Sequence, residues 1–419
     1  GVPYEIHPAW KRALRSAGEG ALREDKFYQI TDNSDSRDCE SDFLPAAVSK
    51  RNTEEEGQEI MGKRKQRTRK TVWSTLLLIA VSFCLMLTGC GGQQENVSDS
   101  GRGDRETVGD QGGSGEIVDS AESSRENTEG DYTLDTKVMD VINDPVFEGY
   151  GRLIFPVDRP IDQNLELRDV GDILVWYNNV NPDRTVEIVN YMKDRAASGE
   201  QIFYDIYTEE EKAADPEKEN TGLFFFRGNP GARTAIVNAG GGFMYVAAMH
   251  DSFPQAMELA ERGYNAFALI YRPGAETACE DLARAIAFIH ENADELQLDV
   301  SGYSLWGGSA GARMAAWLGS YGTAAFGEDA YPAPGAVIMQ YTGLSDVTGS
   351  EPPTYACVGT RDGIASYQSM ESYIRQIQAD GTPAEIEVFD GLGHGFGLGE
   401  STVAEGWIDR AVSFWESVL

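Results

Sequence analysis

The stretch that decides the fold is YSLWGGSAG, residues 303–311, which contains a Gly-x-Ser-x-Gly pattern at residues 307–311. An apolar run, residues 303–306, precedes the pattern, and a helical run, residues 310–317, follows it. This order predicts a strand, a tight turn and a helix, with Ser309 at the turn. Gly307 and Gly311 leave room for that turn, where a side chain would collide with its neighbours. A glycine- and serine-rich helix start without chemistry is the alternative.

Outward from this motif, short apolar runs alternate with amphipathic stretches from about Tyr132 to the end of the chain. We expect strands at residues 201–208, 223–227, 234–238, 265–271, 303–306, 336–341, 354–359 and 385–389. We expect helices at residues 254–262, 278–292, 310–319, 366–379 and 403–418. This alternation predicts an α/β fold, a mostly parallel sheet of about eight strands with helices on both faces. Ahead of it, residues 153–157 and 173–177 also look like strands and residues 184–197 like a helix, with no function assigned to residues 132–200.

A serine hydroxyl needs a base to become a nucleophile at neutral pH. On a sheet of this kind the acid and the histidine follow the serine along the chain. Of the four histidines, His7, His250, His290 and His394, only His394 comes after Ser309, in a glycine-lined loop beyond the last expected strand. The sequence therefore predicts His394 as the base, although a surface loop histidine would look the same.

The partner acid of His394 has to come from the chain between residues 309 and 394, which holds Asp329, Asp346, Asp362, Asp380 and Asp390. Asp362 lies in a tight loop directly after the expected strand 354–359. An acid that orients an imidazole from a neighbouring strand end fits that place. We favour Asp362, with Asp346 as the alternative; an ordinary turn aspartate before glycine is the bland explanation.

Three consecutive glycines, Gly240 to Gly242, follow the expected strand 234–238. Such a run frees backbone N–H groups to face a developing negative charge, and the N–H of Ala310 is the expected second donor. A flexible loop or a phosphate cradle are the alternatives. A P-loop is excluded, because no Lys-Ser/Thr pair follows the glycines.

These motifs together resemble the esterase/lipase group of α/β hydrolases, most of all its acetyl-xylan-esterase-like branch, over residues 221–419. The resemblance implies the α/β-hydrolase fold and a serine carboxylesterase that cleaves short-chain esters, acetyl esters first, including esters on carbohydrate. It implies catalytic roles for Ser309, Asp362 and His394, with Gly241, Gly242 and Ala310 as oxyanion donors. No metal or organic cofactor is implied. The chain departs from the family at Asn238-Ala239, before the glycines, and at Ala312, and neither departure removes a catalytic group.

Aromatic residues near the two glycine motifs are candidates for binding the substrate. Phe243, Tyr245 and Trp306, with Met244 and Tyr341 beside them, are placed to line an acyl or sugar pocket. Core packing explains any one of them equally well.

Two other functions remain open at this point. A serine peptidase of the prolyl-oligopeptidase kind shares the fold, but usually has tyrosine where this chain has Ala310. A non-enzymatic surface binding protein is the second, and the presence of all three residue types of a triad argues against it.

Charge and cysteine content narrow the class of protein. The 419 residues carry 68 acidic and 35 basic side chains, a formal net charge of −33, which excludes nucleic acid as a partner. The expected partner is a small-molecule or polysaccharide ester. Cys279 and Cys357 are the only two of five cysteines in the globular part. Two cysteines make neither a disulfide framework nor a zinc site, so we expect buried thiols.

The first 131 residues predict a different kind of segment. Residues 1–60 are polar without a period; a basic run, an apolar run at residues 72–87 and then LTGC follow the first methionine, Met61. This resembles the signal peptide and lipobox of bacterial lipoproteins, residues 61–89, and implies a lipid on Cys90. Residues 90–131 would be the lipidated cysteine and a disordered acidic linker, and residues 132–419 the catalytic domain.

The position of the signal leads to two further expectations. Translation would start at Met61, which makes residues 1–60 a non-native upstream extension, and the enzyme would sit on the extracytoplasmic side of the cell membrane. A retained membrane helix and a soluble secreted enzyme are the alternatives.

Overall fold

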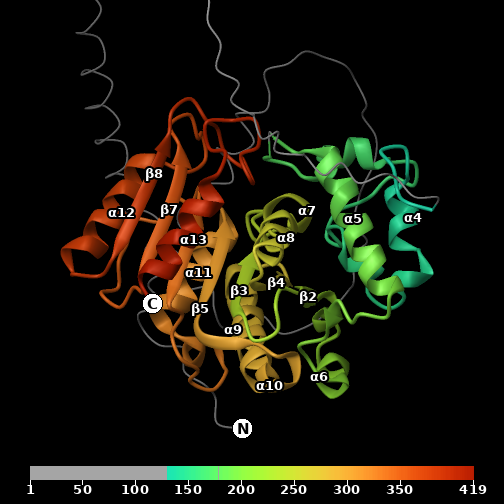
Figure 1. The fold of residues 1–419 in the computed structure, drawn as a ribbon, viewed down its shortest axis with the longest axis horizontal. Helices are drawn as coiled ribbons and strands as arrows, with labels where there is room; N and C mark the ends of the chain where they lie inside the picture. The colour runs from blue at the N-terminus through green and yellow to red at the C-terminus, as the bar shows by residue number, and fades with distance from the viewer. Residues whose placement is uncertain (1–129, 178) are drawn as a thin grey trace, which may run out of the picture. The chain divides into compact units, whose positions relative to one another are not determined.

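The computed structural model describes residues 130–177 and 179–419, and they form an eight-stranded sheet with helices packed on it (Figure 1). The strand order is β1-β2-β4-β3-β5-β6-β7-β8. β2 runs antiparallel to both of its neighbours, and all other pairs are parallel. The strands are β1 (Phe203–Tyr204), β2 (Gly222–Phe226), β3 (Arg233–Asn238), β4 (Asn265–Ile270), β5 (Asp299–Gly308), β6 (Ala336–Gln340), β7 (Thr354–Gly359) and β8 (Ala384–Phe389).

Helices cover both faces of the sheet, as the alternation of side chains in β2 shows. Phe224 and Phe226 point to one face, where both rings contact Phe253 of α8 (Phe253–Glu261), at centroid distances of 5.0 and 5.7 Å. Phe225 points to the other face and stacks on Phe267 of β4 at 4.2 Å. Successive residues of a strand face opposite ways, so a strand buried on both faces reads as a continuous apolar run. The fold is therefore the α/β-hydrolase fold that the sequence predicted.

The remaining long helices are α9 (Ala275–Glu291), α11 (Ala310–Tyr321), α12 (Tyr367–Ala379) and α13 (Trp407–Ser417), with the short helices α7 (Ala248–Asp251) and α10 (Ala293–Leu296) between strands. Each of the five helices expected in this region is present, with ends shifted by up to four residues. Each expected strand is present too, although only Phe203–Tyr204 of the stretch 201–208 pairs with the sheet. Short apolar periods therefore located the elements well.

The segment ahead of the sheet was predicted less well. It consists of α4 (Val138–Ile142), α5 (Pro182–Ala197) and the short 3-10 helices η1 (Pro145–Phe147), η2 (Gly151–Leu153) and η3 (Leu167–Ile173); α6 (Glu209–Ala214) and η4 (Pro216–Asn220) follow between β1 and β2. The helix expected at residues 184–197 is confirmed as α5. Its N-cap Asn181 accepts hydrogen bonds from the N–H groups of residues 183 and 184, and Pro182 suits the first turn.

The two strands expected at residues 153–157 and 173–177 are wrong. In η3 the buried residues are Leu167, Val170 and Ile173, a spacing of three that suits a 3-10 helix and not a strand. Residues 153–156 are buried in succession, and Pro156 cannot donate to a strand ladder. Apolar residues there fill a gap between helices without forming a regular face.

This segment packs on the β1–β2 edge and on α8, beyond β2 in Figure 1. Tyr150 stacks on Phe203 of β1 at 5.0 Å, and Tyr191 of α5 stacks on Phe226 of β2 at 5.7 Å. The segment therefore belongs to the same hydrophobic core as the sheet.

The cysteines and the N-terminal part of the chain were also the subject of predictions. Cys279 and Cys357 are free, buried thiols, as expected. None of the helices in residues 130–177 and 179–419 has the length and apolar character to cross a membrane. The predictions for the upstream extension, the signal peptide and Cys90, and for the linker up to residue 129, lie outside the described residues.

Candidate active site

Ser309 lies at the sharp turn between β5 and α11. Its backbone has φ 51° and ψ −112°, a conformation that residues other than glycine rarely adopt. A Cβ on Gly307 would lie 2.3 Å from the backbone carbon of Gly311, and a Cβ on Gly311 would lie 2.0 Å from the carbonyl oxygen of Asn238. The N–H of Ser309 donates to the carbonyl of Gln340 at the end of β6, 3.0 Å away. Close backbone contacts on both sides thus hold the strained turn in place.

The structure brings Ser309, His394 and Asp362 together from three loops at the carboxyl ends of the parallel strands. His394 Nε2 lies 3.1 Å from Ser309 Oγ, and its Nδ1 lies 2.8 Å from Asp362 Oδ2. The other carboxylate oxygen of Asp362 accepts the N–H groups of Ile364, at 2.8 Å, and Ala365, at 2.7 Å. The imidazole and the carboxylate are both buried. The backbone of its own loop therefore fixes the acid, and the acid orients the imidazole.

Asp346, the alternative acid, is not part of this arrangement. It lies exposed in the loop after β6, and its carboxylate contacts only the Ser345 hydroxyl, 3.5 Å away.

The glycine loop passes beside the serine. A Cβ on Gly240 would lie 2.9 Å from Ser309 Cβ. Gly241 and Gly242 have φ values of 121° and 66°, which glycine adopts without strain. Within the described residues, the N–H groups of Gly241, Gly242 and Ala310 donate to no other group, so they are free to meet a substrate oxygen.

Asp251, at the end of α7, lies behind the glycine loop and was missed by the sequence analysis. The side chain is buried, with the residue 1% exposed, and its Oδ2 accepts the N–H of Gly240 at 2.8 Å and the hydroxyl of Tyr177 at 3.0 Å. Its Oδ1 accepts the hydroxyl of Tyr341. Burial raises the pKa of Asp251, while His250 and these donors oppose the rise. The one sequence signal was a His-Asp pair directly after the apolar run at residues 246–249.

The segment ahead of the sheet also reaches the site, through Trp176 and Tyr177. Trp176 has φ 75°, is 38% exposed, and lies over Gly242, whose Cβ would be 3.0 Å from the indole ring. Tyr177 packs against Gly395 and places its ring 4.9 Å from that of His250. Residues 173–177 were predicted as a strand without a role, so nothing in the sequence pointed to this contact.

His250 supports the loop that carries His394. Its Nε2 lies 2.8 Å from the carbonyl oxygen of Gly395, and burial lowers its pKa, which favours the neutral ring that donates Nε2–H. His290 lies in α9 and contacts the rings of Tyr303 and Tyr331, away from the serine.

The residues predicted to bind substrate have different places. Phe243 follows the glycine loop and stacks on Trp317 at 6.0 Å, and Met244 is 65% exposed. Tyr245 is buried, and its hydroxyl donates to the carbonyl of Val175.

Two aromatic candidates lie inside the protein. Trp306 is not open to a substrate: its indole is buried against Trp407 and Trp415, because it points to the face of β5 that α13 covers. Tyr341 is buried beside His394, at a ring distance of 5.0 Å.

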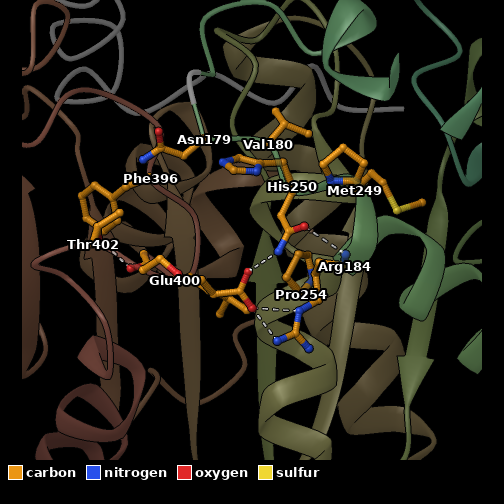
Figure 2. Close-up of a pocket in the computed structure, with 14 residues that line it drawn as sticks. Asn179, Val180, Arg184, Met249, His250, Pro254, Phe396, Glu400 and Thr402 are labelled. Carbon is orange, nitrogen blue, oxygen red and sulfur yellow. Dashed lines mark hydrogen bonds and ion pairs between the residues drawn. The ribbon is translucent and has the colours of Figure 1, made fainter. Parts of the chain in front are cut away.

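A pocket of about 340 Å³ lies between α5, α7 and the loop after His394 (Figure 2). Figure 2 shows Arg184 and Glu400 pointing toward each other across its floor, with His250 at the other end. Neither Ser309 nor Asp362 lines it. Three of its polar side chains are paired with one another, Arg184 with Glu400 at 2.5 Å and Asn181 with Glu400 at 2.8 Å. Among the described residues, no group of histidine, cysteine and acidic side chains is arranged to hold a metal ion.

Comparison with known proteins found one family model that matches part of the chain, and solved structures that resemble it. The family model described as BD-FAE matches residues 228–349. No curated protein matches the chain.

Several solved structures resemble it. A thermophilic esterase from the planctomycete Thermogutta terrifontis, with propionate bound, is 22% identical, with a TM-score of 0.43 over 47% of this chain and 89% of that one. An acetyl ester-xyloside bifunctional hydrolase from Caldicellulosiruptor lactoaceticus is 19% identical, with a TM-score of 0.46 over 52% and 96%. An α/β hydrolase from a Medee basin deep-sea metagenome is 18% identical, with a TM-score of 0.41 over 47% and 92%.

Proposed function

We propose that this protein is a serine carboxylesterase that hydrolyses short-chain esters through an acyl-enzyme. The observation that carries the proposal is the hydrogen-bonded chain from Asp362 through His394 to Ser309, with His394 Nε2 3.1 Å from Ser309 Oγ. A nucleophile within hydrogen-bond reach of a base, which a third group orients, is the arrangement that activates a serine.

The reaction follows from these contacts. Ser309 Oγ attacks the ester carbonyl while its proton passes to His394 Nε2, and Asp362 stabilises the imidazolium through Nδ1–H. The C–O bond to the alcohol then breaks, and His394 gives its proton to the leaving alkoxide. A water molecule repeats the sequence on the acyl-enzyme, which releases the acid and frees Ser309.

The negative charge that forms on the carbonyl oxygen needs donors beside the serine. The N–H groups of Ala310, Gly241 and Gly242 have no other partner among the described residues and would fill this role. Gly240 would not, because its N–H already donates to Asp251.

We propose acetyl esters, including those on carbohydrate, as the preferred substrates, on the strength of the motif likeness to the acetyl-xylan-esterase-like branch. Phe243 and the exposed Met244 follow the glycine loop directly and would contact the acyl group or the alcohol. Tyr245 would act through the loop, since its own hydroxyl is bound to Val175.

Kinetics on p-nitrophenyl esters and on acetylated xylan test this proposal. We expect kcat/KM for p-nitrophenyl acetate to exceed that for the octanoate, and acetate to be released from the xylan. Faster turnover of the octanoate would indicate a lipase, cleavage of a prolyl peptide bond a peptidase, and no turnover by a folded protein a binding function.

We further propose that the enzyme is held on the extracytoplasmic side of the cell membrane by a lipid on Cys90. Two acyl chains anchor a protein stably where one does so only marginally. In the native host, Cys90→Ala should move the protein from the membrane fraction to the soluble fraction and abolish labelling with a fatty acid. Cys84→Ala is the matched control, since Cys84 lies in the part that would be cleaved off. Labelling that survives in Cys90→Ala would contradict the anchor.

A further inference from the structure

Besides Asp362, a second buried carboxylate lies beside the serine turn, that of Asp251. It accepts three hydrogen bonds, from the N–H of Gly240 and the hydroxyls of Tyr177 and Tyr341. Among the described residues no lysine or arginine pairs with it. A buried carboxylate without a cationic partner is costly, and three donors are what makes it tolerable. Such a group is kept for a reason other than packing.

The position of this carboxylate matches a missing side chain. Residue 308, just before the nucleophile, is glycine, and a Cβ built there would lie 2.3 and 2.4 Å from the two carboxylate oxygens of Asp251. The carboxylate thus occupies the space in which residue 308 would otherwise place a side chain. Because Gly308 ends β5 and Ser309 follows it, Asp251 lies directly against the serine turn.

On its other side the carboxylate holds the glycine loop. The Gly240 N–H bond fixes the peptide that precedes Gly241, and so the direction in which the next N–H groups point. A Cβ on Gly240 would lie 2.7 Å from Asp251 Oδ2 and 2.9 Å from Ser309 Cβ, so little space separates loop, carboxylate and serine. Tyr341 extends the contact to His394, whose ring lies 5.0 Å away.

We propose that Asp251 is a positioning residue that holds the glycine loop in register with Ser309, in place of a side chain that residue 308 lacks. The inference rests on the proposed esterase activity. Asp251 contacts no reacting atom; it acts through Gly240, by setting where the donors of Gly241 and Gly242 meet the oxyanion. Oxyanion donors must point at a position the oxygen reaches only in the transition state. The effect therefore belongs in kcat and not in substrate binding.

Asp251→Asn tests this directly. The amide keeps the size of the side chain but removes its negative charge and replaces an acceptor oxygen by a donor NH₂, so at least one of the three hydrogen bonds is lost or reversed in direction. We expect kcat for p-nitrophenyl acetate to fall about 100-fold with KM within about twofold of the wild type. Each rate is divided by the concentration of active serines, measured by titration to completion with a phosphonylating agent. An unfolded fraction of the protein then does not lower the measured kcat.

A second pair of variants asks whether a carboxylate in that space is what matters. In Asp251→Ala the space is empty, and adding Gly308→Asp returns a carboxylate from the strand side. We expect the double variant to recover at least tenfold of the kcat lost in Asp251→Ala. Asp251→Ala with Gly171→Asp is the matched control, because Gly171 lies in η3 and a Cβ there would meet only Val180 Cβ, at 3.8 Å. The control should recover nothing.

The outcomes separate the two proposals. A wild type without ester turnover would overturn the esterase and this inference together. An active wild type with Asp251→Asn at the same kcat per titrated site would overturn only the positioning role. A loss of kcat at unchanged KM, reversed by Gly308→Asp, would establish it.

Discussion

Two regions of the molecule meet at Ser309 and contribute to the site in different ways. Residues 222–419 form the sheet from β2 onward and carry every group that the proposed reaction moves, on loops at the carboxyl ends of parallel strands. Residues 130–200 carry none of them, yet they place Trp176 over Gly242 and the Tyr177 hydroxyl on Asp251. The first region is a sheet covered by helices, whereas the second consists of two α-helices, α4 and α5, and three short 3-10 helices.

The difference separates chemistry from support. Reacting groups need exact mutual positions, and loops anchored in a packed sheet provide them. Residues 130–200 only cover one side of the glycine loop. They do so through Trp176, whose backbone has the strained φ of 75°. Substitutions in the first region should therefore abolish turnover, and those in the second should weaken it.

The largest effect is expected from Ser309→Ala. Removing the nucleophile should reduce kcat/KM for p-nitrophenyl acetate by roughly 10⁴-fold or more, with the circular dichroism spectrum unchanged. Ser301→Ala, at an exposed position near the start of the same strand, is the control and should retain full activity. Near-normal turnover in Ser309→Ala would contradict the role of Ser309 as the nucleophile.

Asp362→Asn should cost almost as much, roughly 10³- to 10⁴-fold in kcat, because the amide would favour the wrong tautomer of His394. Asp346→Asn should change kcat less than about twofold, since its carboxylate is exposed and contacts only Ser345. The reverse ranking would transfer the role of acid to Asp346.

Tyr177→Phe probes the supporting segment. It removes one hydroxyl donor from Asp251 but keeps the ring against Gly395 and His250. The loss of one such bond corresponds to roughly 1 kcal/mol, so kcat should fall about fivefold. Tyr150→Phe changes the same kind of residue in the same segment, away from Ser309, and should leave kcat unchanged. Equal effects of the two would show that the segment acts on stability alone.

Trp176→Ala should affect binding more than turnover. The exposed part of the indole lies beside the glycine loop, where a sugar would contact it, so KM for acetylated xylo-oligosaccharides should rise about threefold, with less change for p-nitrophenyl acetate. Val403→Ala, which trims an apolar side chain exposed elsewhere, is the control. An unchanged KM for both substrates would place Trp176 outside the substrate path.

The smallest effect concerns pH and joins the two regions through His250. Burial lowers the pKa of His250. As the pH falls through the ordinary histidine pKa of about 6.5, the unfolded chain therefore binds a proton at this residue while the folded protein does not. The neutral His250 should make its whole contribution to the free energy of unfolding above about pH 6.5, and this contribution should decline as the pH falls below that value. Urea titrations at about pH 7.5 and 5.5 measure this decline. His250→Phe should show a smaller decline than the wild type; an equal decline would assign it to other groups.

The sequence by itself determined the sheet, because its elements follow from local patterns. Continuous apolar runs mark strands buried on both faces, and amphipathic periods mark the helices between them. It also selected Ser309, Asp362 and His394, since a Gly-x-Ser-x-Gly turn, a loop aspartate after a strand and a single later histidine are each visible in the chain. That the three side chains lie within hydrogen-bond reach is a property of the strand order, which brings residues 309, 362 and 394 to one edge of the sheet.

Only the tertiary structure decided the support of the site. Trp306 and Leu305 are both apolar neighbours in one strand, and which of them faces α13 depends on how the sheet is covered. Asp251, Tyr177 and Gly240 are separated by up to 74 residues and have no shared period, so their contact comes from packing alone. A buried carboxylate acquires its meaning from the donors around it, and a linear sequence does not state which donors those are.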